Sequence, residues 1–149
     1  MCLELKGQCL YVTRKQQAAS SAVWEEVWHQ GQLSRIDDLF TTDFVMHDPL
    51  GRELQGTEQN RQCIGSLRAA FPDVHYSVEE RLAEGDKVVV RYRFRGTHLG
   101  AFGGMPPTGK QVTYTGILIY SIGEGKIAEQ WTAFDLLGFL RQLGVFPNS

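Results

Sequence analysis

The segment from Gly96 to Gly109 is the sequence feature that most constrains the fold. It contains five glycines and two prolines in fourteen residues, which excludes both helix and regular sheet. Strand-like patterns flank it at Val88–Phe94 and Val112–Ile122. The segment must therefore join two strands as a long compact loop, and loops of this length usually serve a function.

Three segments with apolar residues at helical spacing come early in the chain. They span residues 14–28, 34–40 and 57–71, and a short strand-like segment, 44–48, separates the last two. We expect Thr57 to be the N-cap of the third helix.

From residue 74 onward the apolar period changes from helical to alternating. The first strand has apolar residues at Val74, Tyr76, Val78 and Leu82, and further strands follow at 88–94, 112–122 and 126–134. Asp135 is expected to cap a last helix over residues 136–143. Helices on one side of a curved antiparallel sheet predict an α+β fold. If the sheet wraps round the N-terminal helices, the result is a cone-shaped α+β barrel with an enclosed apolar pocket.

Composition fits one globular domain over residues 1–149, with 42% hydrophobic and 21% charged residues. Residues 1–13 lack clear periodicity, and we interpret them as a loosely attached leader. The net charge of −2 comes with no basic stripe, and no apolar run reaches membrane-spanning length, so neither nucleic acid nor a membrane is an expected partner. Cys2, Cys9 and Cys63 lack disulfide or zinc-site spacing and indicate reduced thiols in a cytoplasmic protein.

Five short blocks stand in order between about residues 18 and 144. They are Ala70-Phe-Pro-Asp73, Gly96-Thr-His98, Gly104-Met-Pro-Pro-Thr-Gly109, Gly125-Lys-Ile127 and Leu140-Arg-Gln-Leu-Gly144. In these blocks the chain resembles the SnoaL-like polyketide cyclases, or ester cyclases, of the nuclear transport factor 2-like superfamily of cone-shaped α+β barrels. The superfamily also includes isomerases, dehydratases, epoxide hydrolases and non-catalytic binding domains, so the resemblance implies the fold more specifically than the function.

The resemblance also implies where catalytic residues would lie. In the polyketide cyclases that this sequence resembles, an aspartate on the last strand is the acid/base of an intramolecular aldol ring closure, and a histidine and a glutamine on the preceding strand support it. By ungapped count these positions fall on Thr132, Leu118 and Gly116. A threonine hydroxyl holds its proton too tightly to act as a general base near neutral pH.

Strand parity predicts which side chains face the pocket, because residues two apart share a face of a strand. If Thr132 points inward, so does Gln130, and both are candidate catalytic residues. We expect an apolar wall around Gln130 and Thr132, and such a wall favours a flat hydrophobic ligand. The wall residues are Trp24, Trp28, Tyr92, Phe94, Tyr114, Leu118 and Phe134, with Phe102 and Met105 on the rim formed by the Gly96–Gly109 loop.

His47 and Asp48 are the other acid/base candidates, and only one of two adjacent strand residues can point inward. His47 is a candidate catalytic residue because its ordinary pKa lies near neutrality. The alternative is that Asp48 caps the turn before Pro49 while His47 is a packing residue. We expect Glu129 on the outer face beside an arginine, and a loop-bracing hydrogen bond from His98. No metal-ligand cluster or phosphate-binding glycine loop is present, so no metal or cofactor is expected.

Three functions are compatible with these features. The first is a cofactor-free enzyme that acts on a small hydrophobic or polycyclic substrate as a hydrolase, isomerase or cyclase. The second is a non-catalytic domain that binds a hydrophobic ligand, as the changes at Gly116, Leu118 and Thr132 would allow. The third is a homodimerisation module, in which Ile117, Ile119 and the arginines of 91–95 pair two outer sheet faces.

Overall fold

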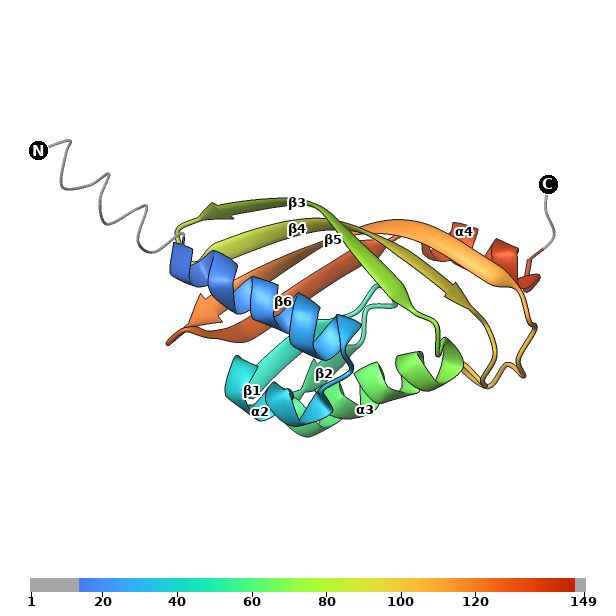
Figure 1. Cartoon of the computed structure of the whole chain (residues 1–149), viewed down its shortest axis with the longest axis horizontal. Helices are drawn as coiled ribbons and strands as arrows, with labels where there is room; N and C mark the ends of the chain where they lie inside the picture. The colour runs from blue at the N-terminus through green and yellow to red at the C-terminus, as the bar shows by residue number, and fades with distance from the viewer. Residues whose placement is uncertain (1–13, 147–149) are drawn as a thin grey trace, which may run out of the picture.

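The computed structural model describes residues 14–146 and shows a curved sheet of six strands that arches over the helices (Figure 1). The predicted α+β architecture is confirmed. In the order of the sheet, the strands are β2 (Glu53–Gln55), β1 (Phe40–His47), β6 (Lys126–Phe134), β5 (Gln111–Gly123), β4 (Lys87–Thr97) and β3 (His75–Glu84). Residues 1–13, which we interpreted as a leader, lie outside the described residues.

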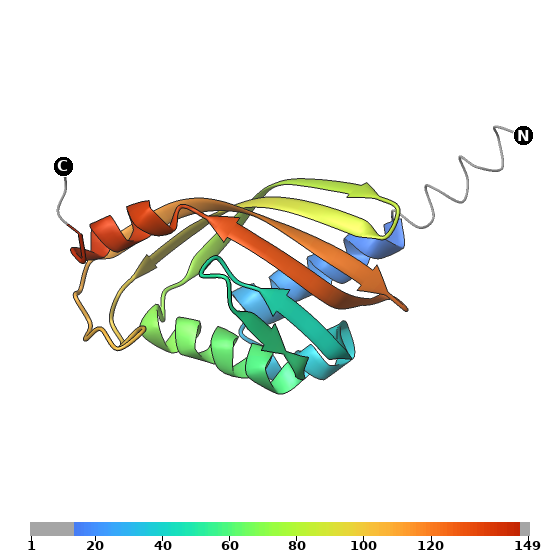
Figure 2. The same ribbon diagram turned by 180° about the vertical axis from the view of Figure 1, so that it is seen from behind.

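The first helix and α3 (Gly56–Ala70) lie on the same side of the sheet (Figures 1 and 2). The first helix is α-helical over residues 14–22 and continues as a π-helical segment, η1 (Val23–His29), in which Gln30 N donates to the carbonyl oxygen of Glu25 at 3.0 Å. Two short helices, η2 (Leu33–Arg35) and α2 (Ile36–Leu39), lead into β1, and α4 (Leu136–Leu143) follows β6. No helix of the described part of the chain is long and apolar enough to cross a membrane.

β4 pairs antiparallel with β5 over its whole length, from Lys87 opposite Ser121 to Thr97 opposite Gln111. Buried and exposed residues alternate along β4, as predicted. On β3 the alternation breaks, because the register against β4 shifts between Val78 and Glu80. Leu82, which we expected on the apolar face, is therefore exposed, and Arg81 takes the half-buried position.

Three features around β1 and the start of α3 differ from the prediction. β1 runs parallel to β6, with Met46 opposite Gln130, whereas we expected an antiparallel sheet throughout. β2 was not predicted and pairs antiparallel with β1. The N-cap of α3 is Gln55 in place of Thr57, and the side-chain oxygen of Gln59 accepts from Gln55 N at 2.9 Å. The β1–β6 pairing connects residues about eighty apart in sequence, β2 is only three residues long, and the cap depends on one local bond. None of the three leaves a periodic signal.

The glycine-rich loop connects β4 to β5 as predicted and is held at both ends. His98 is fully buried, its backbone bonds Lys110 and Gly109, and Thr108 Oγ1 lies 3.0 Å from His98 Nδ1. The predicted bracing role of His98 is thus confirmed. At the tip, Phe102 and Met105 exchange two backbone hydrogen bonds around a two-glycine turn in which both glycines have positive φ.

Candidate functional site

An inner cavity of about 350 Å³ lies between the helices and the inner face of the sheet. Most of the side chains in its wall are apolar: aromatic rings, methionine side chains and leucines. Of the residues that we predicted for it, the structure brings together Trp24, Trp28, Tyr92, Phe102, Met105, Tyr114, Leu118, Gln130, Thr132 and Phe134. The helix, the β4–β5 loop and three strands therefore meet at one place, although they are distant in sequence.

Phe94 does not line the cavity. It is fully buried behind Tyr114, with the two rings stacked at a centroid distance of 4.5 Å, and its other side packs edge-on against Phe71 at 5.3 Å. Strand parity was correct for Phe94, but the rings of Phe71, Tyr76 and Tyr114 pack around its ring. Phe94 thus supports the wall and does not form its surface.

His47, a candidate catalytic residue from the sequence, does not line the inner cavity. The parallel pairing places Met46 on the inner face, so His47 alternates to the outer face, where its ring stacks on Trp131 at 5.4 Å. His47 Nε2 lies 2.8 Å from Glu129 Oε1, so the outer-face partner of Glu129 is this histidine and not an arginine. His47 has no position from which to act on a ligand in the cavity.

Asp48 is the residue of the pair that lines the cavity. Its side chain is only 8% exposed. One carboxylate oxygen accepts from the backbone N–H groups of Leu50 and Arg52 at 2.9 and 2.8 Å, and the other accepts from Arg52 Nε at 2.6 Å. Asp48 therefore caps the turn into β2, as the alternative interpretation stated, and also places a carboxylate in the cavity wall.

Gln130 and Thr132 face the cavity together from β6. Gln130 is 4% exposed, and its Nε2 donates to Thr132 Oγ1 at 2.8 Å and points at Met46 Sδ at 3.4 Å. A threonine oxygen that accepts this bond still has its own proton to donate. The pair can thus orient an oxygen or nitrogen of a ligand, but it offers no base.

Three tyrosines from neighbouring strands supply hydroxyl groups to the cavity wall. They are Tyr76, Tyr92 and Tyr114, of which Tyr76 was not predicted as a lining residue. Burial raises the pKa of each hydroxyl above its ordinary value, and the nearby Tyr114 hydroxyl adds to the effect on Tyr76. All three therefore remain neutral hydrogen-bond donors near neutral pH.

Arg52 and Cys63 complete the polar part of the wall and were also missed from the sequence. Burial raises the pKa of the Cys63 thiol, so the thiol stays protonated near neutral pH. Neither residue had a recognisable signal, because one lies on a turn and the other on the apolar stripe of α3. Among residues 14–146, no group of three or more His, Cys, Asp and Glu side chains is placed to hold a metal ion.

A cone-shaped α+β fold with an aromatic cavity and few polar groups defines a scaffold for small hydrophobic molecules. Residues 19–143 match the profile of the SnoaL-like polyketide cyclase family, and the chain belongs to this family. The resemblance seen in the sequence blocks is thereby confirmed.

Two curated relatives are ester cyclases. Nogalonic acid methyl ester cyclase from Streptomyces nogalater is 29% identical over 119 residues, which cover 78% of this chain and 89% of the relative. Aklanonic acid methyl ester cyclase DnrD from Streptomyces peucetius is 33% identical over 125 residues, which cover 80% and 84% of the two chains.

Solved structures show the same fold. A protein from Jannaschia sp. CCS1 that is assigned as a SnoaL-like polyketide cyclase superposes with a TM-score of 0.85 at 25% identity, over 91% of this chain and 96% of its own. TsrD from Streptomyces laurentii superposes with a TM-score of 0.75 at 26% identity, over 91% and 97% of the two chains.

Proposed function

We propose that this protein binds a flat, hydrophobic, polycyclic ligand in the inner cavity and acts on it as a cyclase-type enzyme, by acid/base chemistry that needs no cofactor. The observation that carries the proposal is the aromatic cavity of about 350 Å³ with polar groups at only a few points of its wall. Family membership supports it, since the two relatives above are named as cyclases of polyketide-derived methyl esters.

Asp48 is the base that the geometry favours. Within residues 14–146 it is the only carboxylate in the cavity wall. A ring closure of the aldol type moves one proton from a carbon beside a carbonyl to the base, forms a carbon–carbon bond from the enolate, and returns a proton to the new alkoxide, so no atom is lost. Asp48 would take and return that proton, and a neutral tyrosine hydroxyl such as that of Tyr92 would donate to the oxygen on which charge develops.

A second candidate function is binding without catalysis. Two observations favour it: the Asp48 carboxylate already accepts three hydrogen bonds, and Thr132 occupies the position at which the resemblance implies an aspartate. A carboxylate that is fully used to hold a turn is a weaker base than a free one. The protein would then have the cone-shaped fold and bind a ligand in the inner cavity without converting it.

Aklanonic acid methyl ester is a suitable first ligand with which to separate these functions. Binding should quench the fluorescence of Trp24 and Trp28, which line the cavity. Conversion is followed by chromatography because a ring closure leaves the mass unchanged. We expect binding and turnover without an added cofactor. Asp48→Asn should bind within about threefold of wild type and lose at least about 100-fold in turnover.

Thr132→Asp is the complementary variant, and it should increase turnover because it adds an ionisable carboxylate beside Gln130. Thermal unfolding of each variant checks that the turn at Asp48 and the end of β6 remain folded. Binding with no product over long incubation would favour the non-catalytic function, and an Asp48→Asn variant with full turnover would remove Asp48 as the base. If neither this ester nor its nogalonic counterpart binds, the proposed ligand class is wrong.

A further inference from the structure

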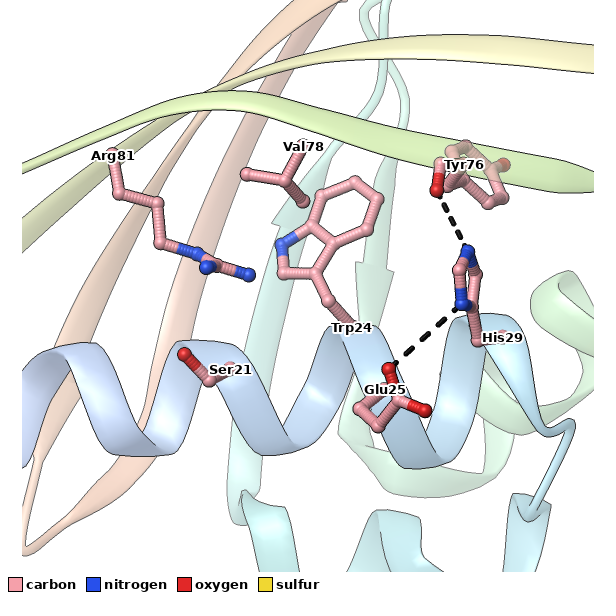
Figure 3. Close-up of a pocket in the computed structure, with 7 residues that line it drawn as sticks. All are labelled: Ser21, Trp24, Glu25, His29, Tyr76, Val78 and Arg81. Atoms are coloured by element: carbon pink, nitrogen blue, oxygen red, sulfur yellow. Dashed lines mark hydrogen bonds and ion pairs between the residues drawn. The ribbon is translucent and has the colours of Figure 1, made fainter.

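A second cavity, of about 290 Å³, opens between the first helix and the edge strand β3 (Figure 3). We call it the outer groove. Trp24 and Tyr76 separate it from the inner cavity, since both residues line both spaces. The outer groove also differs in chemistry, because charged side chains enter it from the helix and from the strand.

Arg81 is the cation of the outer groove, and no side chain or backbone group within residues 14–146 pairs with it. The register shift on β3 turns it toward the helix, whereas strict alternation would have turned it toward solvent. Its Nε is buried and forms no hydrogen bond. Among residues 14–146 no carboxylate pairs with Arg81, although Glu79 and Glu80 pair with arginines of the neighbouring strand.

Trp24 presents a second unsatisfied donor to the same space. Trp24 is 5% exposed, and its buried Nε1 has no acceptor in the described part of the chain. Figure 3 shows the indole nitrogen directed toward the guanidinium group of Arg81. Both groups only donate hydrogen bonds, so neither can satisfy the other, and buried donors without acceptors are unfavourable. The missing partner of both is a hydrogen-bond acceptor placed between them.

The charges in the groove define the kind of acceptor. A guanidinium group favours a carboxylate or another anion. The carboxylate of Glu25 lies on the other side of Trp24, beside His29 at 3.8 Å, and would repel a doubly charged ligand (Figure 3). The Val78 side chain and the Trp24 ring form an apolar wall against which the rest of the ligand can pack.

We propose that the outer groove binds a small monocarboxylate with an apolar body. The carboxylate lies between the Arg81 guanidinium group and Trp24 Nε1, near the hydroxyl of Ser21, and the body packs on Trp24 and Val78. This site is separate from the inner cavity and does not depend on the function proposed there.

Benzoate and its neutral analogue benzamide test this site with the full-length protein. Nitrogen-15 NMR resolves the indole N–H signals, and Trp24→Phe assigns the signal of Trp24. Benzoate should move the Trp24 indole proton downfield in a saturable way, because the proton gains a charged acceptor. Benzamide should cause little change, and the signal of Trp131, which lies on the outer face of the sheet, should stay in place.

Arg81→Met is the decisive variant, since it keeps the length of the side chain and removes the charge. It should weaken benzoate binding at least about tenfold, whereas Arg91→Met, at an exposed arginine on the next strand, should bind as wild type does. Trp24→Phe, which keeps an aromatic wall and removes the donor, should weaken binding about threefold to tenfold by a readout at the Ser21 amide.

The proposal is wrong if benzoate leaves the Trp24 signal unmoved at saturating concentration. It is equally wrong if both Arg81→Met and Trp24→Phe bind benzoate as tightly as wild type. A shift at the indole of Trp28, which lines only the inner cavity, with no effect of Arg81→Met would place the ligand in the inner cavity and also overturn the proposal.

Discussion

Tyr92 and Gly116 face each other across β4 and β5, and the small residue makes room for the hydroxyl of the large one. A Cβ at position 116 would lie 2.5 Å from Tyr92 Oη and 2.6 Å from its Cζ, closer than real Cβ contacts come. We predict that Gly116→Ala destabilises the protein by about 1–3 kcal/mol through overpacking. Urea unfolding measures the change.

The destabilisation should depend on the tyrosine ring. In a Tyr92→Leu background the ring atoms that meet the new Cβ are absent, so Gly116→Ala should cost less there than in wild type, and a double-mutant cycle gives the difference. Equal costs in both backgrounds would show that the strain arises elsewhere. The glycine that the resemblance places at a catalytic glutamine position therefore has a packing role in this chain.

Sequence parity identified most of the cavity wall residue by residue, including Tyr114, Leu118, Gln130 and Thr132. It failed where alternation is interrupted or where the partner strand is unknown. Asp48, and not His47, lines the cavity because β1 pairs parallel to β6 in one particular register. Arg81 faces the first helix because of the register shift between Val78 and Glu80. No residue type in that segment indicates a β-bulge.

The turn between α3 and β3 is tied to the end of β4 by a single carboxylate. Asp73 accepts from Thr97 N at 2.7 Å and from Thr97 Oγ1 at 2.6 Å, and these bonds hold the pKa of Asp73 below its ordinary value of 3.8. A carboxyl whose pKa is lower in the folded than in the unfolded state stabilises the fold above the unfolded value, and this contribution is lost as the pH falls through the folded value.

We therefore predict that the stability difference between wild type and Asp73→Asn shrinks as the pH falls below about 3.8. Urea unfolding of both proteins at a series of pH values measures it, and other acidic groups cancel in the difference. Thr97→Val removes the hydroxyl donor, which is the largest cause of the lowered pKa, and should reduce the pH-dependent part. A difference that is constant with pH would show that Asp73 contributes nothing through its charge.

At the scale of elements, the sequence predicted what period and punctuation encode. The four antiparallel strands, α3 and the loop between β4 and β5 all followed from alternation, helical spacing and glycines. The parallel contact of β1 with β6 joins segments about eighty residues apart, and local pattern does not identify the partner of a strand. The sequence also did not predict the π-helical segment, because its apolar residues have the spacing of an ordinary α-helix. This segment carries Trp24 and Trp28 on the same side of the helix.

The outer face of the whole sheet carries an apolar strip that a single copy leaves uncovered. Ile117 and Ile119 lie two apart on β5 and are 49% and 36% exposed. Arg91 lies opposite Ile117 on β4, and Trp131 lies opposite Ile119 on β6. A long, twisted antiparallel sheet with such a strip can pack face to face with a second copy of itself, because the two-fold operation brings each isoleucine against the apolar strip of its partner.

We predict that the protein is a homodimer through this face at micromolar concentration, with a mass by light scattering of twice the 16.8 kDa of the chain. Replacing both Ile117 and Ile119 by Lys should give a folded monomer, because burying two like-charged pairs at the interface is unfavourable. Leu137→Lys changes a residue on α4 that is as exposed as Ile117 but does not belong to the strip, and it should leave the dimer intact. A wild-type monomer at these concentrations would rule out the dimer, and a dimer that survives the double change would place the interface on another surface.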